Sequence, residues 1–212
     1  MKVAKLVIVF GISLALAANA QAQSLVADIS SPGDVATGVA DLVLGYEFQV
    51  NSPVTVTGLA DFEPTAGGNA VGLWDASRNL LATATVSSSD PSLGNGFFNY
   101  APVPSMTLAP GIYYVGAELD GLDGSDAPYT WDAGGLTTIP QISDMIPAYG
   151  FGSGLTFPEN PDGGATFAYF GGNVVVDGTD PTPDGGTTIL LLGLAFIGLA
   201  IAHRKYRGRK GR

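Results

Sequence analysis

The amino-acid sequence predicts an all-β protein, an antiparallel and jelly-roll-like β-sandwich flanked by an N-terminal signal helix and a C-terminal transmembrane helix. Short apolar runs that alternate with polar residues are separated by frequent turn signals, which is typical of sandwiches and barrels. Glycine and proline account for 30 and 14 of the 212 residues, about a fifth of the chain against an average of about 12%. Because long helices tolerate neither residue, a helical bundle is excluded.

The first 22 residues have the three parts of a secretory signal peptide. Lys2 and Lys5 supply the positive charge, residues 6–17 form the apolar region, and alanines at small-x-small spacing end the segment at residues 18–22. An N-terminal membrane anchor is the alternative interpretation. The short apolar region favours a cleaved signal, so we expect the mature chain to begin after Ala20 or Ala22.

Residues 23–176 are predicted to form an extracellular β-sandwich domain. In the run DLVLGYEFQV at residues 41–50, Leu44, Tyr46 and Phe48 alternate with Gly45 and Glu47, which is the period of a half-buried strand. Strands are predicted at residues 41–50, 54–62, 71–74, 80–86, 97–103, 112–119, 165–170 and 174–176. Residues 75–79 are predicted as a hairpin turn, and the weakly patterned residues 121–165 as long loops.

Four aromatic residues are predicted to be buried together, because they lie on these strands or in apolar runs: Tyr46, Phe48, Trp74 and Tyr114. The chain has no cysteine, which is unusual in small exported domains that need disulfides for stability. A body of about 150 residues buries enough apolar surface without them.

The C-terminal part divides into three predicted segments. Residues 177–186, DGTDPTPDGG, form a polar Pro/Gly linker. Residues 187–203 form a transmembrane helix, and the basic residues 204–212 form a cytoplasmic tail. A buried globular helix is the alternative interpretation of residues 187–203, but such a helix would have a polar face.

Pro183, Asp184, Gly185 and Gly186, followed by the apolar run and the basic cluster, resemble a PEP-CTERM-type protein-sorting signal of the variant whose motif reads Val-Pro-Asp-Ser-Gly. The motif departs from that variant at Thr182 and Gly185. The resemblance implies an exported protein that is held in the membrane by its C-terminal helix until an exosortase-type enzyme processes it. It also implies a Gram-negative bacterium with an exopolysaccharide matrix, and a location in the cell envelope, on the outer surface or in that matrix.

The body resembles the sandwich domain of unknown function found in many PEP-CTERM proteins. The resemblance is carried by the runs GYEFQVNSPVTVTGLADF, VGLWDASRNLLATATV and APGIYYVGAEL between residues 40 and 120. It implies the fold and the location of the domain, but no activity and no catalytic residue.

Charge and composition limit the chemistry of this body. All 19 acidic residues lie between Asp28 and Asp184 together with one basic residue, Arg78, so that this region carries a net charge of −18 and would repel nucleic acids. The only histidine is His203, and cysteine is absent, which excludes Ser-His-Asp, Cys-His and histidine-zinc sites from the body. We therefore expect no enzyme, no catalytic residues and no bound organic cofactor, with glycoside hydrolysis by a carboxylate pair as the open alternative.

Asp120, Asp123 and Asp126 place three carboxylates in a glycine-rich stretch of seven residues. Oxygen ligands of this kind suit a hard cation, so these residues are a candidate calcium site, although the spacing does not match an EF-hand. The alternative interpretation is a solvated turn.

Tyr129, Trp131 and Asp132 form a second candidate site. Exposed aromatic rings can stack on a sugar while a neighbouring carboxylate accepts hydrogen bonds from its hydroxyls; alternatively, both rings pack in the core. The sequence thus predicts a surface or extracellular-matrix protein with a structural or interaction role. The alternative function is a carbohydrate-binding module that recognises an exopolysaccharide.

Overall fold

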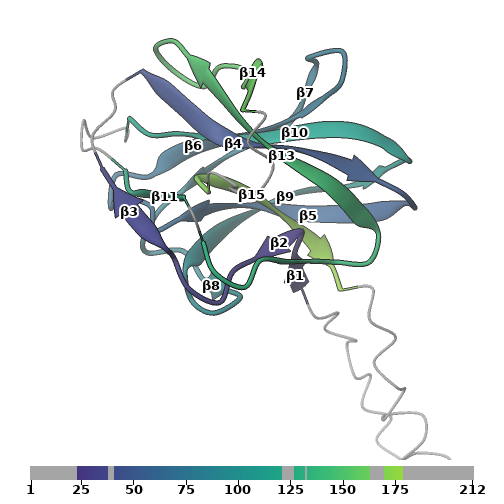
Figure 1. Cartoon of the computed structure of the whole chain (residues 1–212), viewed down its shortest axis with the longest axis horizontal. Coiled ribbons are helices and arrows are strands. Elements are labelled where there is room, and N and C mark those ends of the chain that lie inside the picture. Colours follow the sequence, from purple (N-terminus) through teal and green to yellow (C-terminus); the bar gives the residue numbers. More distant parts are fainter. Residues whose placement is uncertain (1–22, 38–40, 121–126, 132, 163–169, 179–212) are drawn as a thin grey trace, which may run out of the picture. The chain divides into compact units, whose positions relative to one another are not determined.

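The computed structural model describes residues 23–37, 41–120, 127–131, 133–162 and 170–178. Within these residues the chain forms strands, turns and loops and contains no helix, so the all-β prediction is confirmed (Figure 1). The strands are β1 (Gln23–Leu25), β2 (Ala27–Asp28), β3 (Asp34–Ala36), β4 (Leu42–Val50), β5 (Val54–Phe62), β6 (Asn69–Asp75), β7 (Leu80–Val86), β8 (Ser92–Leu93), β9 (Phe98–Leu108), β10 (Gly111–Glu118), β11 (Tyr129–Trp131), β12 (Thr137–Thr138), β13 (Ile142–Phe151), β14 (Asn160–Pro161) and β15 (Gly172–Asp177).

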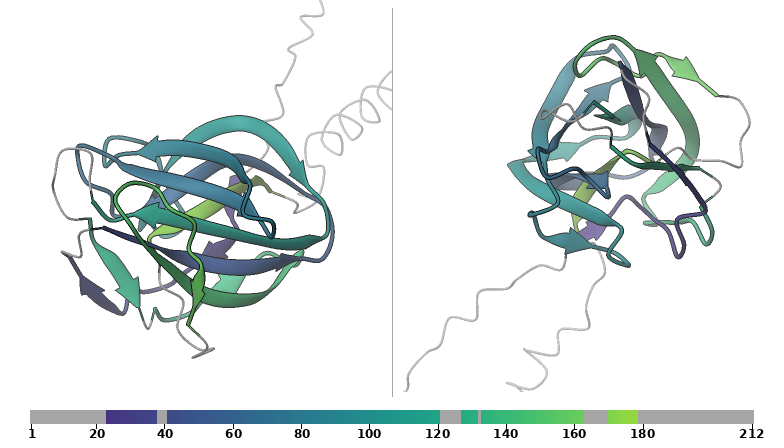
Figure 2. Two further views of the ribbon diagram at one scale, coloured as in Figure 1. Left: turned by 90° about the horizontal axis from the view of Figure 1, so that it is seen from above. Right: turned by 90° about the vertical axis from the view of Figure 1, so that its left-hand side faces the viewer.

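Two antiparallel sheets lie face to face as two layers (Figures 1 and 2). The five-stranded sheet has the order β1-β15-β5-β9-β8, and the six-stranded sheet has the order β14-β13-β4-β10-β6-β7. Without the short or additional strands β8, β13 and β14, the orders become β1-β15-β5-β9 and β4-β10-β6-β7. Numbered along the chain, these eight strands run 1-8-3-6 and 2-7-4-5, which is the strand order of a jelly roll and is consistent with the predicted sandwich.

The core fills the space between the sheets, because one side chain of every two along each strand points inward. Tyr46 and Phe48 of β4 are fully buried there, with ring centroids 5.7 Å apart. The Tyr46 hydroxyl donates a hydrogen bond of 2.6 Å to Oδ1 of Asn173, whose Nδ2 donates to the Ala27 carbonyl at 2.6 Å. These bonds satisfy polar groups that would otherwise be costly to bury.

Several predicted strands agree closely with the observed ones. The bounds of β5 and β7 are those predicted, and β4 starts one residue later than predicted. The hairpin turn at residues 75–79 is also present, since Oδ1 of Asp75 accepts hydrogen bonds from the amides of Ser77 at 2.8 Å and Asn79 at 2.9 Å.

The prediction of long loops over residues 121–165 is wrong for β13. This ten-residue strand pairs with β4 along its length. Its alternation is interrupted by Asp144, which has a φ of 49° at a register shift, and by Pro147 and Gly150. Because of these residues, the segment lacks the regular two-residue alternation that predicts a strand.

The prediction that four aromatic residues are buried together is wrong as well. Trp74 is 4% exposed, but it lies with the half-buried Tyr114 on the outer face of the six-stranded sheet, away from Tyr46 and Phe48. Phe157 covers both residues, with ring centroids 6.0 Å from Trp74 and 4.7 Å from Tyr114. Phe157 belongs to residues 155–161, which lead into β14 and are called the covering segment below.

A row of glycines makes room for this outer layer. Gly45, Gly116 and Gly72 are register partners on β4, β10 and β6. A Cβ atom on Gly72 would lie 2.4 Å from Cη2 of Trp74, and one on Gly116 would lie 2.7 Å from Cγ1 of Val43. The missing side chains thus let the Trp74 ring and the Val43 side chain lie close to the sheet.

The terminal segments lie outside the described residues. They include the predicted signal helix at residues 1–22, the sorting motif, the transmembrane helix at 187–203 and the basic tail at 204–212. Within the residues that are described, no helix is long and apolar enough to span a membrane.

Candidate functional site

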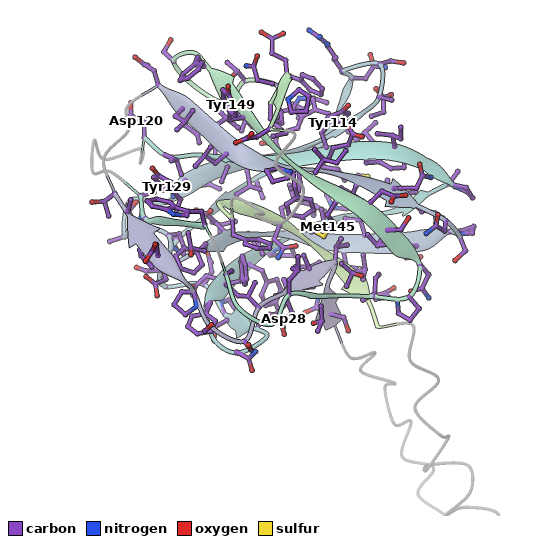
Figure 3. The ribbon with its side chains drawn as sticks, viewed as in Figure 1. Asp28, Tyr114, Asp120, Tyr129, Met145 and Tyr149 are labelled. Carbon is purple, nitrogen blue, oxygen red and sulfur yellow. The ribbon has the colours of Figure 1, made fainter. Side chains whose placement is uncertain are left out.

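Tyr129 and Trp131, two of the residues predicted to contact a ligand, lie on β11. Figure 3 shows Tyr129 at one end of the sandwich. Both residues are half-buried on the same side of the strand, and their ring centroids are 5.4 Å apart. Thr130 between them is fully buried and points the other way. Its amide donates to the Phe170 carbonyl at 3.2 Å and its hydroxyl to the Asp34 carbonyl at 3.0 Å, which fixes the strand and so the two rings.

Tyr129 also lines a shallow pocket of about 170 Å³. The other lining residues come from β4 and β13: Leu42, Leu44, Tyr149 and Phe151. We call these five residues the aromatic pocket. Phe151 is 69% exposed, the highest value among the exposed large hydrophobic residues of the described chain, and its ring lies 5.4 Å from that of Tyr149.

The floor of the aromatic pocket belongs to a small apolar cluster that is separate from the main core. Leu42, Leu44, Leu119 and Ala127 are buried in this cluster, and Tyr129 and Tyr149 pack against it. The amide of Leu119 donates to the Leu42 carbonyl at 2.9 Å, and the amide of Ala127 donates to the Leu119 carbonyl at 2.8 Å. The base of the pocket is therefore held in place by apolar packing and by backbone hydrogen bonds.

Three acidic residues, Asp41, Glu118 and Asp120, are close in sequence to the strand ends that carry the pocket, but none of them is among its described lining residues. Asp41 precedes Leu42, and its carbonyl accepts a hydrogen bond of 2.9 Å from the amide of Gly152, next to Phe151. Burial raises the pKa of Glu118, and the charges of Asp120 and Asp41 raise it further, while a hydrogen bond from the Gly154 backbone opposes the shift. Glu118 pairs with Val43, which points to the side of β4 opposite Leu42 and Leu44, so the Glu118 side chain lies on the other face of the sheet from the pocket.

The candidate calcium site is only partly described. Asp120 is half-buried at the end of β10, whereas Asp123 and Asp126 lie outside the described residues. Among the side chains that are described, no group of three could hold a metal ion. Calcium binding by the three aspartates stays a prediction.

Asp132, the carboxylate predicted to accept sugar hydroxyls, also lies outside the described residues. The described part of the prediction places Tyr129 and Trp131 together, and neither ring is in the main core. The sequence did not identify Leu42, Leu44, Tyr149 or Phe151 as site residues. The alternation of Tyr149 and Phe151 is the one local signal that both rings share a face.

The lining of the aromatic pocket suits contact with the face of a ring. Among the described residues, the lining groups are aliphatic side chains and phenyl or phenol rings. A pocket of about 170 Å³ is smaller than the roughly 300–1,000 Å³ of sites for drug-sized ligands, so it would hold a single ring of a larger molecule.

Comparison with known proteins concerns the C-terminal segment. Residues 183–206 match the family model of the VPDSG-CTERM motif, a variant of the PEP-CTERM-like exosortase sorting signals. The match includes the predicted motif Pro183, Asp184, Gly185 and Gly186 and confirms the resemblance noted in the sequence. The signal implies export, location at the cell surface and processing by an exosortase-type enzyme. None of the curated proteins matches the chain.

Proposed function

We propose that this protein is a non-catalytic structural module of the cell surface or extracellular matrix, and that its aromatic pocket attaches it to a neutral polysaccharide. The observation that carries the proposal is the group of three aromatic rings, Tyr129, Tyr149 and Phe151, around a small open pocket. Lectin domains are among the proteins that use the jelly-roll architecture, but this likeness is an analogy of fold alone.

The chemistry of the pocket favours a sugar over an apolar peptide side chain. A pyranose ring has an apolar face that can lie against Phe151 or Tyr149, and hydroxyls at its edge that donate hydrogen bonds. The phenol hydroxyls of Tyr129 and Tyr149, which line the pocket, can exchange hydrogen bonds with sugar hydroxyls but not with an apolar side chain. The strong negative charge of the body disfavours uronic acids and other anionic sugars. The expected ligand is therefore a neutral or amino sugar in a polymer.

The position of the pocket is consistent with display. A three-residue connection joins Val50 at the end of β4 to Val54 at the start of β5, and Val176 of β15 pairs with Val56 of β5. The end of β15 therefore lies near the end of β4. Leu42 and Phe151, in contrast, lie at the beginning of β4. The eight residue steps along β4 separate these ends by about 26 Å. The pocket therefore lies at the end of the domain opposite Asp177, the last residue of β15.

We also propose how the chain is processed. The signal peptide is removed near Ala20 or Ala22, residues 187–203 anchor the exported chain in the membrane, and cleavage near Pro183 and Asp184 releases it. Intact-mass spectrometry of the exported protein measures both ends. A mature form that keeps Arg204–Arg212 would contradict cleavage at the C-terminal signal.

Sugar binding is tested by affinity electrophoresis of the exported protein in gels that contain neutral, aminated or uronic-acid polysaccharides. We expect retardation by a neutral or aminated polymer, and at least about tenfold weaker binding for Phe151→Ala and Tyr149→Ala, a loss of about 1.4 kcal/mol. Ile112→Ala is the matched control, since Ile112 is a large apolar residue that is 40% exposed at the other end of the sandwich.

Equal binding by the three variants and the unchanged protein would exclude the aromatic pocket as the sugar site. Absence of binding to every polymer would reduce the proposal to the structural role alone. Preference for the uronic-acid polymer would contradict the charge argument, even if the pocket variants lost binding.

A further inference from the structure

Strand β7 is the outermost strand of the six-stranded sheet, and among the described strands it pairs only with β6. It is seven residues long, whereas the other strands at the ends of the two large sheets, β1, β8 and β14, have two or three residues. Leu80 is 50% exposed, and Thr83 and Thr85 are also exposed. The edge of β7 that faces away from β6 therefore has backbone amides and carbonyls that could pair with another strand along most of its length.

Long free edges are usually protected by proline, by charge or by irregular geometry, because they can pair with other chains. Strand β9 has this protection: where it extends past β8, it carries Pro102 and Pro104, which cannot donate a hydrogen bond. Strand β7 contains neither proline nor a charged residue. Its register shift with β6 lies at Leu80, so that residues 82–86 stay regular.

We propose that β7 pairs with β7 of a second copy of this chain, antiparallel and centred on Thr83. The residues around Thr83 suit this pairing, since alanines flank it on both sides and the ends of the strand, Leu80 and Val86, are both aliphatic. Thr83 would lie opposite Thr83 of the other copy and Ala82 opposite Ala84, both of which are favourable or neutral cross-strand neighbours. An interface in which the same residues face each other is what a two-fold dimer requires.

The two faces of the sheet also match in this register. Ala82 and Ala84 pack against the core, while Thr83 and Thr85 face the solvent. Because pairing about Thr83 places even-numbered residues opposite even-numbered ones, inward side chains meet inward side chains. The six-stranded sheets of two copies would then form one continuous sheet with a shared inner face.

The distribution of charge favours a second copy in this orientation over other contacts. The body has a net charge of −18, which makes most surfaces repel one another, but residues 79–89 contain no charge. Arg78, the single basic residue between Lys5 and Arg204, precedes β7, and Asp90 follows it. An antiparallel partner brings the Arg78 end of each strand toward the Asp90 end of the other.

Pairing along one strand buries less surface than a standard stable interface, so the contact is expected to be weak for the free protein. Proteins that are confined to a surface have a high local concentration, which raises the occupancy of such a contact. The proposal is independent of sugar binding, since β7 contributes no residue to the aromatic pocket.

The test uses single cysteines, since the natural chain has none. Thr83→Cys places the two thiols opposite each other in the proposed dimer, and Thr107→Cys, an exposed position on the proline-bearing β9, is the matched control. Under mild oxidation of the exported protein, we expect the disulfide dimer to form at least about tenfold faster for Thr83→Cys, because pairing raises the effective thiol concentration. Equal rates for the two variants would overturn the proposal.

A second measurement does not depend on an introduced thiol. Sedimentation of the exported protein at rising concentration should show a weak dimer that Thr83→Lys abolishes, because two lysines would face each other, and that Thr107→Lys leaves unchanged. Thermal melting checks that both variants are folded. A monomer at all concentrations, or a dimer that persists in Thr83→Lys, would contradict pairing through β7.

Discussion

The two faces of the six-stranded sheet both carry aromatic residues, but these residues are buried in different ways. On the inner face, Tyr46 and Phe48 are fully covered by the opposite sheet and lie near Phe170 and Tyr113. On the outer face, Trp74 and Tyr114 are covered by Phe157 of the covering segment.

The surroundings of the two aromatic groups differ as well. On the inner face, the polar partner of Tyr46 is the neutral side chain of Asn173. On the outer face, Arg78 lies over the Phe157 ring at 5.1 Å and pairs with Glu159 at 3.0 Å. Tyr114 donates a hydrogen bond to Glu47. We call the inner group the folding core, because it joins the two sheets. The outer group holds the covering segment against one sheet. Four experiments can break or sharpen this distinction.

The largest effect is expected for Phe48→Ala. Phe48 is fully buried, and removal of a buried phenyl ring leaves a cavity that costs about 3–5 kcal/mol. Denaturant unfolding measures the loss in the free energy of unfolding, with Ile112→Ala, 40% exposed on the same sheet, as the control. A loss below about 1 kcal/mol would mean that the inner face is not the folding core.

A smaller effect is expected for Gly72→Ala, which tests the outer face. The added methyl group would lie 2.4 Å from Cη2 of Trp74 and must displace that ring. Overpacking of this kind costs about 1–3 kcal/mol. In Gly111→Ala, the nearest atom to the new methyl group is 3.6 Å away, so this control should stay within about 0.5 kcal/mol of the unchanged protein. Equal stability of the two variants would show that the Trp74 ring is loosely held.

Phe157→Ala should destabilise the protein by about 1–2 kcal/mol, because the half-buried ring loses apolar contacts and its interaction with Arg78. Hydrogen exchange of residues 155–161 should accelerate more than that of β4 or β5, since the covering segment can open without the sandwich. Phe151→Ala, at a residue 69% exposed, is the control for the loss of a phenyl ring. Uniform acceleration across both sheets would mean that the outer group is also part of the folding core.

The smallest effect concerns the ionisation of tyrosine. Burial, together with the hydrogen bond to Glu47 and its charge, raises the pKa of Tyr114 to about 12, and burial raises the pKa of Tyr46 further. Both phenols hold their protons more tightly in the folded protein than in the unfolded chain, where the pKa is about 10. Their contribution to stability is therefore complete below pH 10 and decreases as the pH rises toward 12.

An ultraviolet titration distinguishes the two phenols. Tyr114 should ionise near pH 12 in the folded protein, and Tyr46 only when the chain unfolds. Glu47→Gln should lower the pKa of Tyr114 and leave Tyr46 unchanged. A titration of Tyr46 within the folded state would contradict its full burial.

The sequence predicts the inner face of this sheet far better than the outer one. The alternation at Leu44, Tyr46 and Phe48 depends on neighbouring residues only, so it locates β4 and its core side. Trp74 was predicted to be buried, which it is, but burial on the outer face depends on Phe157, more than 80 residues later. Because the residue that covers Trp74 is distant in sequence, no local sequence pattern predicts this contact.

The same contrast holds for the candidate site. Tyr129 and Trp131 are separated by one residue, so the sequence alone predicts that they lie side by side. Their partners Tyr149 and Phe151 lie on β13. The sequence pattern does not predict this strand, because Asp144, which has a positive φ, and Pro147 interrupt its alternation. Only the pairing of β13 with β4 brings these rings to Leu42 and Leu44 and so completes the pocket.

The pairing of Gln23 with Asp177 places both ends of the described domain at one pole, and the aromatic pocket lies at the opposite pole. Under the proposed sugar binding, one ring in each pocket would give a weak contact, but a polymer with many identical rings would engage many copies at once. Retention of the polymer would then be governed by avidity, and so by the density of copies, rather than by the affinity of a single domain.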